Sequence, residues 1–333
     1  MSSNYKIRKI KSDNYDQWDN FVEKSNEGML FHKSFWLEAS ENEFNIIGCF
    51  TGEELRAGMA IGIDTNMIGK NIVTNPVLSP YSGIIYEEKR GKRVTYNSNK
   101  KKMTEEIINY VEERYNNFSL NLSFKITDVQ PFIWNNFNCE VKFTYVLTIS
   151  DLDKVWKKMD SGTRRSIKKA QKDKLSVKKH DNFDTMLNLV KMSYNRQNMT
   201  IENFKSAAKR YFNILNTRDC CKNFVCYDKD DRPIGGVFIV WDNKRSYYLL
   251  GGYDPEHGHH GATSLAMWEA IKYTSQTLDL DQFDFEGSMV KSIERFFRKF
   301  GGELTPYYKI YKQDSILSGY KLIKEKVKTF IKK

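Results

Sequence analysis

The sequence of 333 residues predicts an α/β chain that contains two related units. Two segments have the pattern of a strand, a charged turn and a second strand, namely NIIGCFTGEELRAGMAIGI at 45–63 and NFVCYDKDDRPIGGVFIVW at 223–241. Each segment carries a cysteine followed by an aromatic residue, and a glycine nine positions after that cysteine. The length also exceeds the roughly 100–200 residues of one domain. The alternative to a repeat is chance similarity between two hairpins.

In the first half, apolar residues at helical spacing predict helices at 13–25, 33–41 and 102–116. The hairpin at 45–63 lies between the second and third of these helices. The stretch NPVLSPYSG at 75–83 is interrupted by prolines and therefore predicts an irregular loop. We expect a first domain over residues 1–150, in which a twisted mixed sheet is flanked by helices.

The second half repeats this order of elements and predicts a second domain over residues 151–312. Helical spacing is present at 164–172, 182–197, 201–216 and 262–277. A strand is expected at 245–251, after the second hairpin. The tail at 320–333 has an apolar stripe opposite lysines and predicts a C-terminal helix within 313–333. We expect this helix to join the first domain, with peripheral contact at the inner membrane as the alternative.

Composition narrows the class of protein. No apolar run approaches the roughly 18 residues that a membrane span needs, and the first residues lack the apolar core of a signal peptide, so we expect a cytoplasmic protein. The five cysteines have no CxxC spacing, which favours reduced thiols over disulfides or zinc. We therefore expect no metal site.

Positive charge is concentrated in the second half of the chain. Residues 1–150 carry 18 Lys and Arg against 19 Asp and Glu, whereas residues 151–333 carry 35 against 23. The segment 154–179 alone holds 11 basic and 2 acidic residues. This density favours a polyanionic partner such as tRNA, a nucleotide-linked or lipid-linked pyrophosphate, or an anionic membrane surface, and we expect no binding to DNA. The alternative is a solvated basic helix face.

The stretch FDFEGSMVKSIERFFRKFGG at 283–302 predicts a strand, a turn at Gly287 and a helix. Alternation along the strand places Phe283 and Phe285 on one face, and Asp284 and Glu286 on the other. If the phenylalanines face a core, both carboxylates face a cleft. Either carboxylate could then act as a general base or hold a substrate ammonium. The alternative is that one of them caps the helix or forms an ion pair.

A hairpin, a third strand, a glycine-bearing loop and a long helix follow one another in the second half, and this order resembles acetyltransferases of the GNAT type. The loop and helix read YDPEHGHHGATSLAMWEAI. In that family the loop backbone holds the pyrophosphate of coenzyme A, and the resemblance assigns this cofactor-binding role to Gly258, Gly261 and Ala262. Three histidines stand within the loop without the spacing of a metal motif, so we expect them to be exposed.

Two GNAT-like units, together with TRRSIKKAQK, YYLLGGYDPEHGHHGATSL and FDFEGSMVKSIERFFRKFGG, resemble the FemABX family over almost the whole chain. The corner FDFEGS also resembles BioF2-like GNAT acyltransferases. The resemblance implies two tandem GNAT-like domains. It also implies transfer of an amino acid from aminoacyl-tRNA to an amine of a peptidoglycan-type precursor.

The resemblance also implies roles for individual residues. Thr163, Arg164, Arg165 and Lys168 match a motif that holds acceptor phosphates, for which the fork of a guanidinium is well suited. In FFRKFGG, Arg298 stands where relatives carry a lysine, and Lys299 follows. We expect catalysis by Glu286, Asp284 and Arg298. Further substrate contacts are expected from the side chains of Tyr81, Tyr248, Tyr253 and Lys299.

The leading hypothesis is an aminoacyltransferase that forms an amide on a cell-envelope precursor with aminoacyl-tRNA as co-substrate. No Ser-His-Asp or Cys-His arrangement is legible, so direct attack by the amine is expected. One alternative is an N-acyltransferase that uses acyl-coenzyme A or an acyl carrier protein on an amino sugar. Another alternative is a non-catalytic RNA- or glycan-binding protein. No tightly bound cofactor is expected.

Overall fold

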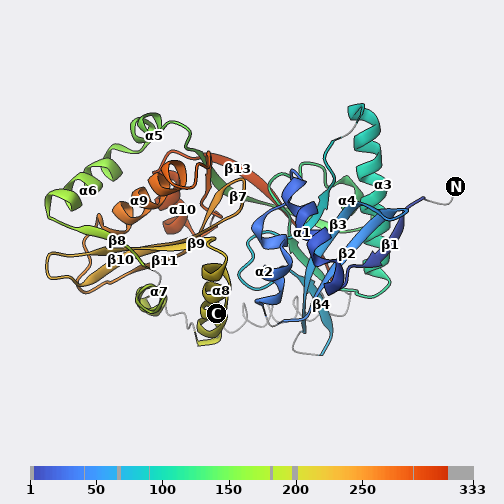
Figure 1. The fold of residues 1–333 in the computed structure, drawn as a ribbon, viewed down its shortest axis with the longest axis horizontal. Coiled ribbons are helices and arrows are strands. Elements are labelled where there is room, and N and C mark those ends of the chain that lie inside the picture. Colours follow the sequence, from blue (N-terminus) through green and yellow to red (C-terminus); the bar gives the residue numbers. More distant parts are fainter. Residues whose placement is uncertain are drawn as a thin grey trace, which may run out of the picture. The chain divides into compact units, whose positions relative to one another are not determined.

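The computed structural model describes residues 4–40, 42–65, 69–89, 91–180, 183–196, 202–287 and 289–313. The chain divides into two compact units (Figure 1). Unit 1 comprises Met1–Lys142 and the chain from Tyr307, and unit 2 comprises Phe143–Pro306. The two divisions fall within the strands β7 (Asn138–Thr148) and β13 (Glu303–Lys312). The expected C-terminal helix at 313–333 lies outside the described residues, apart from residue 313.

Unit 1 contains a mixed sheet in the order β1-β2-β3-β4-β6-β13, with β5 also paired to β3. Strands β4 and β6 are parallel, and the other pairs within this unit are antiparallel. The remaining strands of the unit are β1 (Lys6–Lys9), β2 (Phe44–Thr51), β3 (Glu54–Thr65), β4 (Asn71–Thr74), β5 (Gly83–Tyr86) and β6 (Phe118–Asn121). Its helices are η1 (Ser12–Asn14), α1 (Tyr15–Lys24), η2 (Leu30–His32), α2 (Ser34–Glu38), α3 (Arg93–Glu112) and α4 (Gln130–Trp134).

Both faces of the unit 1 sheet are covered, so its inner strands are apolar on both sides. Along β2, Ile46 belongs to a cluster with Trp18 of α1, whereas the next residue, Ile47, belongs to a cluster with Ile107 of α3. This is the period of two that a strand imposes on its side chains. Helix α3 begins nine residues before the expected start at 102, because its first turns are polar and show no apolar spacing.

The strands of unit 2 are also mixed and follow the order β7-β12-β11-β10-β9-β8. Strands β11 and β12 are parallel, and the other pairs are antiparallel. The strands besides β7 are β8 (Ser176–His180), β9 (Cys221–Tyr227), β10 (Pro233–Trp241), β11 (Ser246–Tyr253) and β12 (Gln282–Asp284). The helices are α5 (Leu152–Lys158), α6 (Ser161–Lys172), α7 (Asp184–Arg196), α8 (Glu202–Thr217), α9 (Ala262–Gln276) and α10 (Lys291–Arg298).

Helix α9 forms the centre of the unit 2 core. Leu265, Met267 and Ile271 of this helix are buried together with Phe283 of β12 and Phe285 of the corner after it. Figure 1 shows α6 and α9 on one face of the sheet and α7 on the opposite face. Each unit is thus a mixed sheet flanked by helices, and the predicted fold class is confirmed.

The repeated hairpins at 45–63 and 223–241 are antiparallel strand pairs in both units. In each pair the register shifts close to the cysteine that the two segments share. The shift lies between Cys49 and Phe50 in the first pair, and between Pro233 and Gly235 in the second. No described helix has the length and the apolar character required to span a bilayer.

Candidate active site

A large cavity of unit 2 lies where strands β11 and β12 separate. These parallel strands pair only at Ser246 with Phe283 and at Tyr247 with Asp284, although β11 continues to Tyr253. Beyond these pairs, a cavity of about 730 Å³ is lined by β11, by the corner after β12, and by the first turns of α6 and α9. Ligands of α/β proteins commonly bind at such openings, beyond the carboxyl ends of parallel strands.

The corner after β12 is held in an unusual backbone conformation. Glu286 has φ 57° and Gly287 has φ 69°, so two consecutive residues are left-handed. A left-handed residue other than glycine costs about 1–2 kcal/mol. Gly287 is required for space as well, since a Cβ atom there would lie 2.1 Å from the carbonyl oxygen of Phe143. Strain of this kind is often found at functional sites.

Asp284 positions this corner and does not face the cavity. Its side chain is fully buried, and its Oδ1 accepts hydrogen bonds from the Thr144 hydroxyl at 2.6 Å and from the Glu286 N–H at 2.8 Å. The expectation that Asp284 faces the cleft is therefore wrong, and the structure does not support a catalytic role for it. Strand β7 is the antiparallel neighbour of β12 in the sheet, and its Thr144 side chain meets the Asp284 carboxylate.

Glu286 lines the cavity. Its Oε1 atom is buried and accepts no hydrogen bond from any described residue. Burial, and after it the negative charge of Asp284, raises the pKa of the Glu286 carboxyl well above its ordinary value. A buried acid without a partner is costly, and a raised pKa makes its carboxylate a stronger proton acceptor. Glu286 can therefore take a proton from a substrate amine.

Tyr248 stands in the same cavity and packs edge-on against Phe297 with 5.1 Å between ring centroids. A Cβ atom at Gly251 would lie 1.8 Å from the Tyr248 hydroxyl oxygen, so this glycine makes room for the hydroxyl. Burial, followed by the charges of Tyr194 and Glu286, raises the pKa of Tyr248. The hydroxyl therefore stays protonated and can donate to a ligand. Tyr253 also lines the cavity.

Of the two cations expected here, Lys299 lines the cavity and Arg298 does not. Arg298 is exposed, and its Nε pairs with Oε1 of Glu294 at 3.0 Å, one turn earlier in α10. Arg298 does not line the cavity, so the structure does not support a catalytic role for it. Lys299 is fixed because its carbonyl oxygen accepts the Asp160 N–H at 2.9 Å.

That bond brings the end of α10 to the start of α6. Asp160 is the N-cap of α6, and its Oδ1 accepts the Thr163 N–H at 3.1 Å. Thr163 lines the cavity, as does the first turn of α6 around it. Arg164, Arg165 and Lys168 lie on the same helix but do not line the cavity, and they form no ion pair with any described residue.

The loop before α9 is folded on itself. Gly261 donates its N–H to Nδ1 of His259 at 3.0 Å, and Ala262 donates to the His259 carbonyl at 2.8 Å. The Nε2 of His259 lies 3.0 Å from Asp173 of the α6 C-terminus. The N–H groups of Gly261 and Ala262 are therefore engaged, and neither residue lines the cavity, nor does Gly258. The cofactor-binding role expected of these three residues is not supported.

Tyr81, in unit 1, is a core residue. It is fully buried, and its ring packs edge-on against Tyr307 at 5.3 Å and against Phe124 at 5.7 Å. A substrate in solution does not reach its hydroxyl, so the expected contact of Tyr81 with the acceptor is wrong. The sequence around it, NPVLSPYSG, gave no indication of this aromatic cluster.

Several residues of the cavity were not singled out from the sequence. They belong to the end of α7, to β11, to the first turn of α9 and to α10, namely Ser193, Tyr194, Gly252, Thr263, Ser264 and Phe296. The pair Gly251–Gly252 was a usable signal, because two glycines inside a strand indicate close approach. Indeed, a Cβ at Gly252 would lie 2.4 Å from the Leu189 backbone of α7.

The described residues contain no cluster of three or more His, Cys, Asp or Glu side chains that could hold a metal ion. His257 pairs with Asp254, and His259 with Asp173, while His260 lines the cavity. Burial raises the pKa of the Cys49 and Cys226 thiols to about 12, which makes them poor nucleophiles.

Comparison with known proteins agrees with this architecture. Residues 157–298 match a family described as an acetyltransferase (GNAT) domain. This match lies within unit 2 and includes the basic helix, the loop before α9 and the corner after β12. No curated protein matches the chain significantly.

Solved structures share the fold of the whole chain. A crystal structure of FemX is similar with a TM-score of 0.71 and 11% identity, over 91% of this chain and 96% of FemX. A tandem GNAT protein from the clavulanic acid biosynthesis pathway has a TM-score of 0.54 and 8% identity, with 92% and 97% covered. The L-PGS of Bacillus licheniformis has a TM-score of 0.53 and 8% identity, with 92% and 93% covered.

Proposed function

From the tandem GNAT fold that this chain shares with FemX, we propose that the protein is an acyltransferase that attaches an aminoacyl group to an amine. The donor is aminoacyl-tRNA, and the acceptor is an amine of a cell-envelope precursor of the peptidoglycan type. The observation that carries this proposal is the buried, unpartnered Oε1 of Glu286 in the cavity between β11 and the corner after β12.

The reaction needs no covalent enzyme intermediate. The acceptor nitrogen attacks the carbonyl carbon of the aminoacyl ester, which forms the C–N bond and a tetrahedral oxyanion. Glu286 takes the proton that the nitrogen loses. The bond between that carbon and the ribose oxygen then breaks, and the proton returns from Glu286 to the departing oxygen. General acid–base catalysis of this kind contributes about 10²–10⁴-fold to rate.

Two features of the cavity support stabilisation of the oxyanion. Strand β12 does not pair with β11 beyond Tyr247, and the register with β10 shifts at Leu249, so the backbone of β11 is open toward the cavity there. N–H groups of this edge are the proposed donors to the acyl oxygen. The Lys299 ammonium supplies positive charge to the same cavity.

The loop before α9 favours tRNA over coenzyme A as donor. In this chain His259 and the loop itself occupy the N–H groups of Gly261 and Ala262, which a pyrophosphate would otherwise use. The exposed residues Arg165 and Lys168 on α6 provide charge for a polyanion. Arg164, with a buried Nε that has no partner among the described residues, is the proposed contact for an acceptor phosphate.

A second candidate is an N-acyltransferase that uses acyl-coenzyme A. The match of residues 157–298 to a GNAT acetyltransferase domain favours it. Thr263 and Ser264, in the first turn of α9, line the cavity, and their N–H groups stand where a helix has no internal acceptors. These groups could hold an anionic part of the cofactor.

The two donors are distinguished by one experiment. The purified full chain is incubated with charged tRNA or with acetyl-coenzyme A, each with a nucleotide-linked muropeptide or an amino sugar, and the products are identified by mass. We expect an aminoacylated muropeptide from charged tRNA. A product from acetyl-coenzyme A alone contradicts the proposal and supports the second candidate.

The role of Glu286 is tested in the same assay. Glu286→Gln should lower kcat/KM by about 10²–10⁴-fold, because the amide cannot accept the proton. Glu303→Gln makes the same chemical change at an exposed residue of unit 2 that does not line the cavity, and it should leave kcat/KM within about twofold. Equal kcat/KM of Glu286→Gln and the unaltered protein would contradict the role of Glu286 as general base, whereas the absence of product from every donor would support a binding function in place of catalysis.

A further inference from the structure

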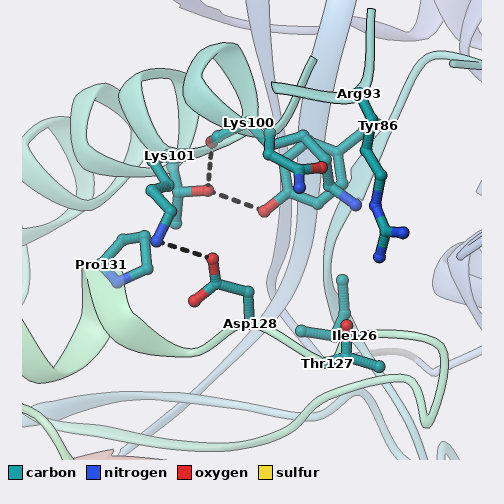
Figure 2. Close-up of a pocket in the computed structure, with 10 residues that line it drawn as sticks. Tyr86, Arg93, Lys100, Lys101, Ile126, Thr127, Asp128 and Pro131 are labelled. Atoms are coloured by element: carbon teal, nitrogen blue, oxygen red, sulfur yellow. Dashed lines mark hydrogen bonds and ion pairs between the residues drawn. The ribbon is translucent and has the colours of Figure 1, made fainter. Parts of the chain in front are cut away.

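A second cavity, of about 120 Å³, lies in unit 1 (Figure 2). Tyr86 at the end of β5 forms one wall, and residues from the first three turns of α3 form another. The segment 126–131, before and at the start of α4, closes it. The reaction proposed for unit 2 makes no use of this cavity.

Cations dominate the lining. Arg93, Lys100 and Lys101 all come from α3, and Asp128 is the single carboxylate among the lining residues. Lys101 holds that carboxylate, with Nζ 2.9 Å from Oδ2 of Asp128, and the Gln130 N–H donates to Oδ1 at 2.9 Å. The acidic group of the cavity is therefore already satisfied by Lys101, and Arg93 and Lys100 are the further cations of the lining.

Lys100 is fixed rather than mobile. Its Nζ pairs with Oε1 of Glu27 at 2.7 Å and lies 4.1 Å from the centre of the Tyr86 ring. The Tyr86 hydroxyl bonds to Thr104 Oγ1 at 2.7 Å, and Thr104 in turn donates to the Lys100 carbonyl at 2.7 Å. Because an ammonium has three protons and Glu27 takes one, Lys100 keeps donors for a ligand.

Arg93 has no such partner. It forms no ion pair or hydrogen bond with any described residue, and Figure 2 shows its side chain reaching from the start of α3 toward Ile126 and Thr127. Asn97, one turn later, and Thr127 likewise line the cavity without a hydrogen-bond partner in the described part of the chain. The side chains of these residues thus offer a guanidinium, an amide and a hydroxyl to the same space, while the backbone groups of Arg93 and Asn97 belong to helix α3.

We propose that this cavity binds a phosphate group, either as inorganic phosphate or as the terminal group of a small phosphomonoester. A guanidinium meets two phosphate oxygens with two parallel N–H bonds, and the neighbouring ammonium and hydroxyl can reach the others. The volume of about 120 Å³ is a few times the roughly 30 Å³ of a water molecule, which suits a tetrahedral anion but not a nucleotide.

Calorimetric titration of the full chain with inorganic phosphate at constant ionic strength tests this proposal. We expect saturable binding with one site. Arg93→Gln should weaken the binding about tenfold, because one charge-assisted contact is lost. Arg93 is exposed and starts the helix, so the substitution leaves the fold intact. Thr127→Val, which removes only a hydroxyl, should weaken binding less.

Lys92→Gln is the matched control. Lys92 precedes Arg93, is exposed and does not line the cavity, so its removal lowers the local charge equally but should change the affinity by less than twofold. Equal weakening by Lys92→Gln and Arg93→Gln would overturn the proposal, since it would indicate attraction by charge alone. Acetate that binds as tightly as phosphate would also overturn it.

The source of the phosphate is distinguished in a second titration with glycerol phosphate. Tighter binding of glycerol phosphate than of inorganic phosphate identifies a monoester as the ligand, and the reverse order identifies free phosphate. Binding should be the same in Glu286→Gln, because Glu286 belongs to unit 2. This control separates the phosphate site from the proposed transfer reaction.

Discussion

Protonation of the Glu286 carboxyl affects both the activity and the stability of the protein. Burial raises its pKa, so between its ordinary value and its raised value the folded protein binds a proton that the unfolded chain releases. Stability contributed by this proton is present at low pH and is lost as pH rises through that window. The same rise in pH produces the carboxylate that the reaction needs.

Glu286→Gln should therefore increase the melting temperature relative to the unaltered protein, and this gain should grow from pH 5 to pH 8. The glutamine is neutral throughout, so it avoids the cost of a buried charge. Thermal unfolding at both pH values measures the difference, with Glu303→Gln as the exposed control. A gain that is the same at both pH values would show that Glu286 has no raised pKa.

Variants of Lys299 and Arg298 provide a second test, which asks which of these two cations contributes to catalysis. Lys299→Gln should lower kcat/KM at least tenfold if the ammonium acts on charge in the cavity. Arg298→Gln removes a neighbouring cation that pairs with Glu294 at the surface and should change kcat/KM by less than twofold. The product assay measures both. A larger loss in Arg298→Gln would restore the role expected from the sequence.

The different positions of these two residues show what a sequence pattern resolves. The motif FFRKFGG correctly indicated a cation near the corner, but successive residues of a helix point about 100° apart. Glu294, one turn earlier, holds Arg298 at the surface, and the Asp160 N–H bond fixes the position after it. Contacts from Asp160, distant in sequence, decide which side chain enters the cavity.

At the scale of elements, the turn at 286–287 controls the direction of α10. Gly287→Ala should destabilise unit 2 by about 2–4 kcal/mol, because it combines a left-handed φ with a clash. Gly301→Ala is the control in the same unit: φ is 82°, but the nearest atom is 3.1 Å away. It should cost about 1 kcal/mol. Denaturant unfolding that gives equal losses would contradict the clash.

The corner after β12 also shows where the alternation of side chains along a strand predicts their environment and where it does not. Phe283 and Phe285 are fully buried, as the period of two predicts for a strand over a core. The same period places Asp284 on the other face of the strand, where the sequence predicts an open cleft. That face is covered because Thr144 of β7, 140 residues earlier, meets the carboxylate. A pairing over this separation leaves no trace in the local pattern.

The whole molecule has an uneven charge that bears on its donor. If unit 2 binds tRNA through α6, the affinity should fall linearly with the logarithm of salt concentration. Replacing Arg165 and Lys168 by glutamine should reduce the slope by about one to two. Replacing the exposed Lys11 and Lys102 of unit 1 is the control and should not change it. Filter binding of charged tRNA measures the slopes, and equal slopes would exclude α6 as the contact.

The sequence predicts the two-unit architecture because each unit contains a hairpin of the same pattern, and the strands of a hairpin pair locally. The boundaries expected after residues 150 and 312 differ from the divisions at 142 and 306, since β7 and β13 continue across them. A strand has no compositional break at such a point. The cavity of unit 1, by contrast, combines residues 86, 93–104 and 126–131, which no motif connects.

Strand β13 has a consequence for synthesis of the chain. Its residues Lys309–Lys312 pair with β6 of unit 1, and Ile310 is buried in the core beneath α3. A ribosome releases all of unit 2 before it releases this strand. Synthesis of unit 1 begins first, but the edge of β6 therefore stays unpaired until unit 2 has been synthesised. The amino-terminal half of the protein is the last to be completed.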